Sequence, residues 1–287
     1  MGWEEGLVLW CVVWGVAALI GYGMAWVGAT SRQRTVWLAG RIEEVREPRH
    51  GGSQVGGVWV VVSYRDPDSG RRVTVTNDGE RGEAITCAWP GRRIGVGYRR
   101  GRPHAYRFST APDPSGRGLG WPTFALFLVY AGLVALASVV WGPPWALIGC
   151  GGPGAVFAVG HLPATVRATK RRAERWAAAD TVSGRIVAVL TDVTIDQNDG
   201  STMTTVTPVV SFTTGAGQEV TAHCTRHVPD PAHAYGREVP VCYDREDPAV
   251  FTLDRAAEHR SQGLDVVFNL AVAVVLVAAA VTGLLML

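Results

Sequence analysis

A charge-free stretch near the start of the chain decides the fold class. It reads GLVLWCVVWGVAALIGYGMAWVGAT and covers residues 6–30. At a rise of 1.5 Å per residue, about 20 apolar residues in a helix cross a hydrocarbon core about 30 Å thick. We therefore expect a transmembrane helix over residues 6–28. A cleaved signal peptide is the alternative, but the preceding MGWEEG is acidic, and the apolar run exceeds the roughly 7–15 residues of a signal sequence.

Apolar stretches of the same kind occur further along the chain. Residues 118–166 carry no charge and are long enough for two crossings, and Gly142-Pro143-Pro144 interrupts them near the middle. Because proline ends one helix and starts the next, we expect a hairpin of transmembrane helices over 120–141 and 145–166. A fourth span is expected over 266–287. The composition, 47% hydrophobic and 18% charged, excludes a disordered or collagen-like chain.

The charges predict how these spans are oriented. Every Lys and Arg lies within residues 31–117 or 167–265, and basic residues concentrate beside the spans. The positive-inside rule then places both polar segments in the cytoplasm and both termini outside. Lys170 is the single lysine among many arginines, alanines and glycines, which is typical of a high-GC bacterial genome. We therefore expect a multi-pass protein of a bacterial inner (plasma) membrane.

A basic segment follows the third span directly. Residues 167–179 are good helix formers and are expected to continue that helix out of the bilayer. Its cations would bind anionic lipid headgroups, each contributing about 1 kcal/mol near the surface. Nucleic acid is the poorer partner, because the segment offers only Trp176 for stacking and the net charge of the chain is +2. We call these residues the basic cluster: Arg167, Lys170, Arg171, Arg172 and Arg175.

The two polar segments resemble each other. Five short matches occur in the same order at an offset of about 145 residues, which indicates an internal duplication. The matched pairs are 40–45 with 184–189, 61–64 with 209–212, 73–74 with 220–221, 91–98 with 236–243, and 103–106 with 248–251.

Within each copy the local pattern is that of β-strands. Residues 58–64 and 205–212 are rich in β-branched and aromatic side chains, and Gly-rich turns follow them. We predict two β modules, over 35–108 and 180–254, each a small antiparallel barrel or sandwich of five or six strands. The fold class is then a mixed α and β membrane protein with four transmembrane helices. Modules this small bury little core, so we expect them to dock on each other or on the helices.

The order of these matches resembles a known bacterial family. A G-x-[IV]-x-x-V motif, a strand that ends in an aromatic residue, a glycine turn and G-x-x-[IV]-x-V-x-Y-[DR]-x-x-x-P are similar to the family called domain of unknown function 3592. Residues 243–248 (YDREDP) fit its closing signature well, whereas residues 98–103 (YRRGRP) lack the acidic positions. The resemblance implies small β modules beside transmembrane helices and brings no activity with it.

One cluster of soft ligands stands in the second module. His223, His227 and Cys242 are the candidates for a zinc site, which needs four ligands at about 2.0–2.3 Å. The pattern of residues 220–225 is that of a strand, which sends His223 and Cys224 to opposite faces. The first module has no matching histidine. We therefore expect no metal and no other cofactor.

Polar side chains inside the expected spans suggest a second function class. His161 and Asn269 are the strongly polar residues there, and a polar group in hydrocarbon needs a partner. They predict either a proton or ion pathway or an interhelical hydrogen bond. The run GCGGPG at 149–154 resembles a phosphate loop but lacks the G-K-[ST] ending, and we expect it to allow close helix packing.

No catalytic motif accompanies these features, so we do not expect an enzyme. The sequence instead favours cytoplasmic β modules that act as binding or structural elements and present strand edges to a protein partner. A small transporter or channel around His161 and Asn269 is the alternative. A metal-dependent enzyme at His223, His227 and Cys242 is the third hypothesis.

Overall fold

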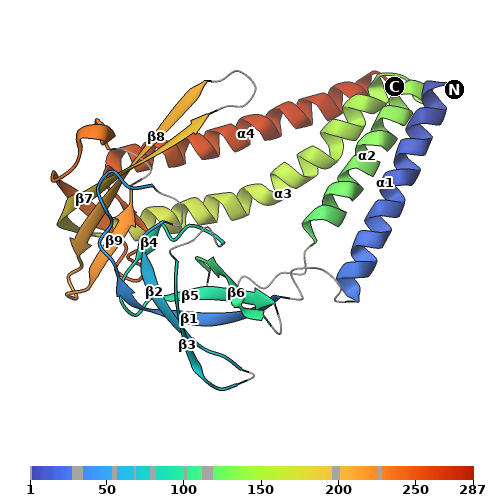
Figure 1. The fold of residues 1–287 in the computed structure, drawn as a ribbon. Coiled ribbons are helices and arrows are strands. Elements are labelled where there is room, and N and C mark those ends of the chain that lie inside the picture. Colours follow the sequence, from blue (N-terminus) through green and yellow to red (C-terminus); the bar gives the residue numbers. More distant parts are fainter. Residues whose placement is uncertain are drawn as a thin grey trace. The chain divides into compact units, whose positions relative to one another are not determined.

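The chain folds into two compact units. The computed structural model describes residues 2–27, 35–53, 57–67, 69–77, 82–99, 102–111, 119–195, 201–224 and 228–287. One unit, the helical unit, comprises Met1–Arg34, Gly116–Ala173 and His259–Leu287, and the other, the β unit, comprises Thr35–Ser115 and Glu174–Glu258 (Figure 1). The mixed helix and sheet content expected from the sequence is therefore present.

Four helices are long and apolar enough to cross a membrane. They are α1 (Trp3–Trp26), α2 (Gly120–Trp141), α3 (Pro144–Ala177) and α4 (Arg255–Leu285), and in α4 the apolar part is Val266–Leu285. Gly142, with φ of 100°, separates α2 from α3. The apolar and basic segments expected at 145–166 and 167–179 form one helix, α3, which continues through Pro153 and Pro163.

Glycines let these helices approach closely. A Cβ atom built on Gly132 of α2 would lie 2.7 Å from the sulfur of Cys11 on α1. A Cβ on Gly151 of α3 would lie 2.7 Å from the backbone nitrogen of Ala280 on α4. The run 149–154 is therefore a packing surface, as expected, since only glycine leaves room for a neighbouring backbone there.

The first β sheet is antiparallel and strongly curled. Its order is β3 (Arg72–Thr76), β2 (Val60–Arg65), β1 (Thr35–Val45), β5 (Arg93–Arg99) and β6 (Arg102–Ser109). The hydroxyl of Tyr106 on edge strand β6 donates to the carbonyl oxygen of Thr76 on the opposite edge strand, 2.8 Å away. This side-chain bond brings the last residue of β3 near β6, and the curled sheet surrounds a core that includes Ile42, Val62 and Ile94.

The second sheet repeats this order and adds one strand. It runs β11 (Phe251–Thr252), β10 (Glu238–Tyr243), β7 (Asp180–Ile195), β8 (Thr202–Thr213), β9 (Glu219–His223) and β4 (Cys87–Ala88). Without β4, the strands follow one another as β3, β2, β1, β5 and β6 do in the first sheet. Strand β4 lies within the first predicted module and precedes β5 in the chain, but it pairs with β9 of the second sheet.

The two sheets also share local hydrogen bonding. The pairing of β1 with β2 and the pairing of β7 with β8 each contain a register shift, or β-bulge. At each shift the N–H of an isoleucine donates to a carbonyl oxygen in the turn before β5 or β10. A glycine N–H of the same turn donates to the carbonyl oxygen of that isoleucine. The first sheet has Ile42 to Arg92 at 2.9 Å and Gly91 to Ile42 at 2.7 Å. The second has Ile186 to Arg237 and Gly236 to Ile186, both at 2.9 Å.

Candidate functional site

One segment of the first module joins the two sheets. This bridging segment, Gly82–Ala88, receives the N–H of Val58 at the oxygen of Ile85, 2.7 Å away, and so stays attached to its own module. Its last residues, Cys87 and Ala88, pair with β9 of the second sheet, and both are buried. The oxygen of Thr86 also accepts the N–H of a β9 residue at 2.8 Å. The bridging segment therefore joins the two modules through backbone hydrogen bonds.

A second contact lies on the other side of the second sheet. In the loop after β1, the N–H of Gly51 donates to the oxygen of Val189 on β7, and the N–H of Thr191 donates to the oxygen of Gly52, both at 2.9 Å. The ring of His50 stacks on that of Tyr235 with centroids 4.2 Å apart. First-module backbone thus bonds both to β9 and to the part of β7 that lies beyond its pairing with β10, and the two modules form one unit.

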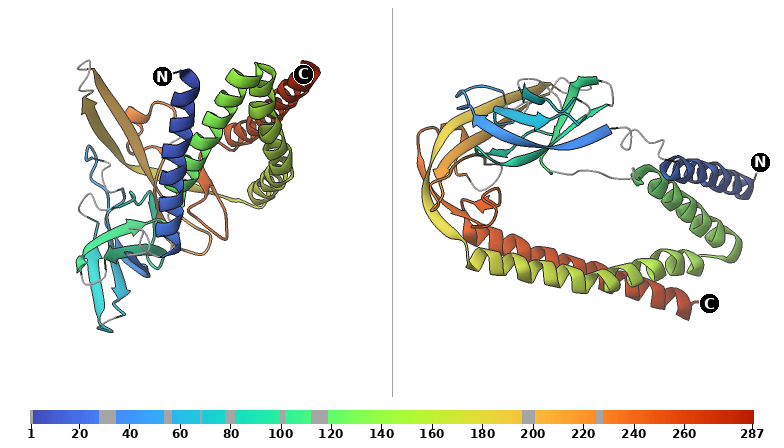
Figure 2. Two further views of the ribbon diagram at one scale, coloured as in Figure 1. Left: turned by 90° about the vertical axis from the view of Figure 1, so that its right-hand side faces the viewer. Right: turned by 90° about the horizontal axis from the view of Figure 1, so that it is seen from below.

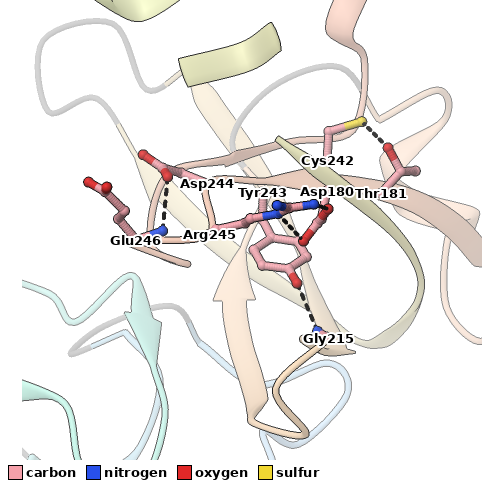
Figure 3. A network of polar contacts seen from close by, with 8 residues as sticks. All are labelled: Asp180, Thr181, Gly215, Cys242, Tyr243, Asp244, Arg245 and Glu246. Atoms are coloured by element: carbon pink, nitrogen blue, oxygen red, sulfur yellow. Dashed lines mark hydrogen bonds and ion pairs between the residues drawn. The ribbon is translucent and has the colours of Figure 1, made fainter. Parts of the chain in front are cut away.

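The closing loop of the second module forms a polar network, which we call the junction (Figure 3). Arg245 donates two hydrogen bonds to the carboxylate of Asp180, at 2.7 and 2.6 Å. The hydroxyl of Tyr243 accepts the N–H of Gly215 at 2.8 Å. The bond from Arg245 lowers the pKa of Asp180, and the same pair raises the pKa of Arg245.

The junction also connects to the ends of two helices. Arg175 in the last turn of α3 lies 3.9 Å from the carboxylate of Asp244. Asp254 precedes α4, and its carboxylate accepts the N–H of Ala257 at 2.9 Å, which caps that helix. Trp176 of α3 is buried. The loop that ends β10 therefore contacts the end of α3 through Asp244, and Asp254 caps the start of α4.

Two of the predicted metal ligands, His223 and Cys242, lie on strands β9 and β10, which are separated by β7 and β8 in the second sheet. His223 is buried on β9, and no hydrogen-bond partner lies near its Nε2 atom among the described residues. Cys242 contacts the hydroxyl of Thr181 at 3.2 Å instead, and His227 lies outside the described residues. No group of three or more metal-binding side chains occurs in the part of the chain that the structure describes. His223 and Cys224, which we expect on opposite faces of a strand, are both buried.

Burial governs the titration of these groups. It lowers the pKa of His223 to about 4, so the imidazole is neutral and offers no charge to a ligand. It raises the pKa of Cys87 and of Cys224 to about 12, so neither supplies a thiolate near neutral pH. The arrangement therefore favours a structural role for all three side chains.

The other predicted residues lie on helix surfaces. His161 on α3 and Asn269 on α4 are both exposed, and the His161 ring stacks on that of Phe157 with centroids 5.6 Å apart. All five residues of the basic cluster are exposed on α3. This exposure suits contact with headgroups, whereas the pathway hypothesis would need His161 and Asn269 to face a common interior.

Sequence reasoning did not single out His50, Tyr235 or Asp180. The first two become neighbours only because the loop after β1 docks on β7. Asp180 could have been found, because it starts a strand directly after the basic helix, and the arginine of YDREDP needs an acidic partner. No protein-family model, curated protein or solved structure matches the chain. The candidate site therefore rests on geometry alone, and that geometry describes backbone edges and a junction rather than a pocket.

Proposed function

We propose that the protein is a four-span integral membrane protein of a bacterial plasma membrane whose duplicated β modules form one cytoplasmic binding unit for a protein partner. Four apolar helices of suitable length and an exposed basic cluster at the end of one of them support the membrane assignment. The resemblance to domain of unknown function 3592 agrees with this architecture and remains a prediction.

The duplication is supported by the matched strand order and by the paired hydrogen bonds at Ile42 and Ile186. Independent sheets of this size rarely share a bulge, a left-handed glycine and the same turn bonding at matched places. Gly91 and Gly236 have φ of 94° and 75°, a region that favours glycine. Two copies of one ancestral module account for all of these features at once.

One observation carries the binding role: the edge of β9 is occupied by β4, while the matching edge of β3 pairs with no described strand. The N–H of Asp66 bonds to the oxygen of Arg71 in the β2–β3 turn. Because bonding alternates along a strand, the backbone groups of Arg72 and Thr74 then point away from β2. The matching edge of the second module thus already binds a strand, and we assign the β3 edge of the first module to a strand of a partner protein.

The experiment has two parts. The topology is tested with single-cysteine labels in intact cells, where a tag after Leu287 should react with an impermeant reagent and one at Ser69 should not. A shielded tail would overturn the orientation. Edge binding is tested by a photo-crosslinking residue at Arg72, with the exposed Arg41 on the internal strand β1 as the matched position.

The proposal predicts a crosslinked protein at Arg72 that is absent at Arg41 and is lost in Thr74→Pro. Proline at this position removes one outward N–H and leaves the bonds to β2 in place. Equal crosslinking at both positions, or a product unaffected by Thr74→Pro, would show that β3 is not the binding edge.

A further inference from the structure

The β7–β8 hairpin of the second module is longer than the matching β1–β2 pairing of the first module. Strands β7 and β8 pair continuously from Gly184 opposite Phe212 to Ile195 opposite Thr202, well beyond the reach of β9 (Figure 1, Figure 2). In the first sheet the corresponding pairing of β1 and β2 ends at Val45 opposite Val60. We call residues 191–195 and 202–206 the arm. This extension is not needed to complete the sheet.

The arm exposes apolar side chains and an unprotected strand edge. Val193, Ile195 and Met203 are 60%, 64% and 69% exposed. The last pair between β8 and β9 is Val209 with His223, so residues 202–206 of β8 have no described strand on their outer side. Those five residues read TMTTV and include no charge and no proline. Natural edge strands usually carry such protection against pairing with another chain.

The hydrogen bonds between β8 and β9 show which backbone groups of β8 face outward. On the β9 side, the N–H of Cys224 donates to the oxygen of Pro208 at 2.7 Å, and the N–H of Thr214 donates to the oxygen of Gln218 at 2.9 Å. Even-numbered residues of β8 therefore bond toward β9, and odd-numbered residues bond toward β7. Along the arm this alternation turns the N–H and C=O groups of Thr202, Thr204 and Val206 outward.

We propose that this edge pairs with the same edge of a second copy of the chain. When two copies pair antiparallel about a two-fold axis, the residue at the axis lies opposite the same residue of the other copy. Thr204 is the central residue of the outward edge 202–206, so it is placed at the axis. Thr202 then faces Val206 of the second copy, and Met203 faces Thr205. The register forms about six backbone hydrogen bonds, and threonine pairs stabilise antiparallel strands.

A second copy fits this edge better than an unrelated partner does. The edge is uncharged, so it offers no ion pair that would select a different strand, and its register is satisfied by its own sequence. If the proposed membrane anchoring holds, two copies share one plane, and their effective concentration rises without any new contact. Insertion of Val193 and Ile195 into lipid is the competing use of the arm, and it needs no dimer.

The first test is disulfide crosslinking of purified full-length protein, in detergent and in liposomes. Residues that face each other in a hydrogen-bonded antiparallel pair have Cα atoms about 5.5 Å apart, which a disulfide can span. Thr204→Cys should give a covalent dimer on mild oxidation with diamide, at several times the wild-type level. Thr194→Cys is the matched control on the other strand of the same arm and should stay at the wild-type level.

The second test removes the central hydrogen bonds. Thr204→Pro lacks the outward N–H and leaves the bonds to β7 intact, whereas Thr204→Val keeps the N–H. Light scattering should show a dimer for wild type and Thr204→Val. It should show a dissociation constant at least about tenfold higher for Thr204→Pro, because both central bonds are lost. Circular dichroism checks that this variant remains folded.

Three results would overturn the proposal. They are a monomeric wild type in both media, equal crosslinking of the two cysteine variants, and a folded Thr204→Pro that still dimerises. If the wild type is a monomer whose arm is protected from proteolysis by liposomes, and Val193→Asp loses that protection, the arm inserts into lipid instead. Edge pairing of β8 can fail while the crosslink at β3 succeeds, so this test is independent of the proposed partner binding.

Discussion

The buried His223 makes the β unit sensitive to acid in a defined pH range. Burial lowers the pKa of its imidazole in the folded protein to about 4, from the ordinary value of 6.5. The folded state therefore favours the neutral ring, and the unfolded state binds more protons between these two values. The contribution of His223 to the free energy of unfolding is fully present above pH 6.5. It falls as the pH drops through this range and is lost below pH 4.

The size of the effect follows from the two pKa values. At about 1.4 kcal/mol per pKa unit, this shift lowers the free energy of unfolding by about 3 kcal/mol when the pH is below both pKa values. Between pH 7.5 and pH 5 the linkage relation gives a loss of about 2 kcal/mol in the free energy of unfolding. The paired carboxylates of the β unit titrate below this window, because hydrogen bonds lower the pKa of Asp180 and of Glu83.

His223→Leu should remove this dependence. Leucine fills a similar volume, carries no titrating group, and eliminates an Nε2 atom that has no hydrogen-bond partner near it in the described structure. Its stability at pH 7.5 should equal or exceed that of the wild type, since an unpaired buried polar atom costs free energy. His233→Gln is the matched control, because His233 is exposed beside Asp230.

The assay is urea unfolding of the full-length protein in detergent, followed by near-ultraviolet circular dichroism of the β unit at pH 7.5, 6 and 5. The wild type and His233→Gln should lose stability in parallel, and His223→Leu should lose much less. A wild type whose stability is unchanged across this range, or a His223→Leu with the wild-type slope, would refute the assignment of acid sensitivity to this residue.

Three further changes test other parts of the structure. Gly40→Ala should destabilise the β unit by about 1–3 kcal/mol in thermal unfolding, because its Cβ would lie 2.7 and 2.8 Å from two valine methyl groups, whereas Gly215→Ala, whose nearest neighbour is 3.6 Å away, should be tolerated. Tyr243→Phe and Tyr98→Phe each remove one hydroxyl bond, to Gly215 and Asp66, and should each lower the free energy of unfolding by about 1 kcal/mol; a large effect in only one would argue against matched modules. Replacement of the whole basic cluster by glutamine should increase the fraction of chains with a shielded tail in the cysteine-labelling assay, and an unchanged fraction would show that other charges set the orientation.

Local patterns predicted the elements of this fold well. Charge-free runs of about 20 residues gave the four apolar helices, since hydropathy over such a length depends on composition alone. The matching motifs at Gly40 and Gly184 predicted corresponding strands, which are β1 and β7. Cβ atoms built on both glycines would lie 2.7 Å from a valine methyl group of a neighbouring strand, so the residue type is required by close packing in each sheet.

The connection between the modules could not be predicted in the same way. Strand β4 has two residues, Cys87 and Ala88, which is too short for an alternating pattern, and its pairing partner β9 lies in the other module. Its strand geometry is set by the ladder it joins and by burial of both side chains. The contact of His50 with Tyr235 likewise depends on where a loop docks. Such features arise from tertiary pairing, which overrides local preference.

The two modules therefore differ in which strands pair at their edges, although they share a strand order. The second module has its β9 edge covered by β4, and its closing loop contacts the end of α3 through Asp244. The ion pair of Arg175 with Asp244 is largely exposed on the arginine side and contributes little to stability by itself. The first module contributes β4 to its neighbour, and its own β3 pairs with β2 and with no other described strand. Under the proposed duplication, one edge of the common module is therefore covered by β4 in the second copy and by no described strand in the first, and this difference is the basis for assigning the β3 edge to a partner.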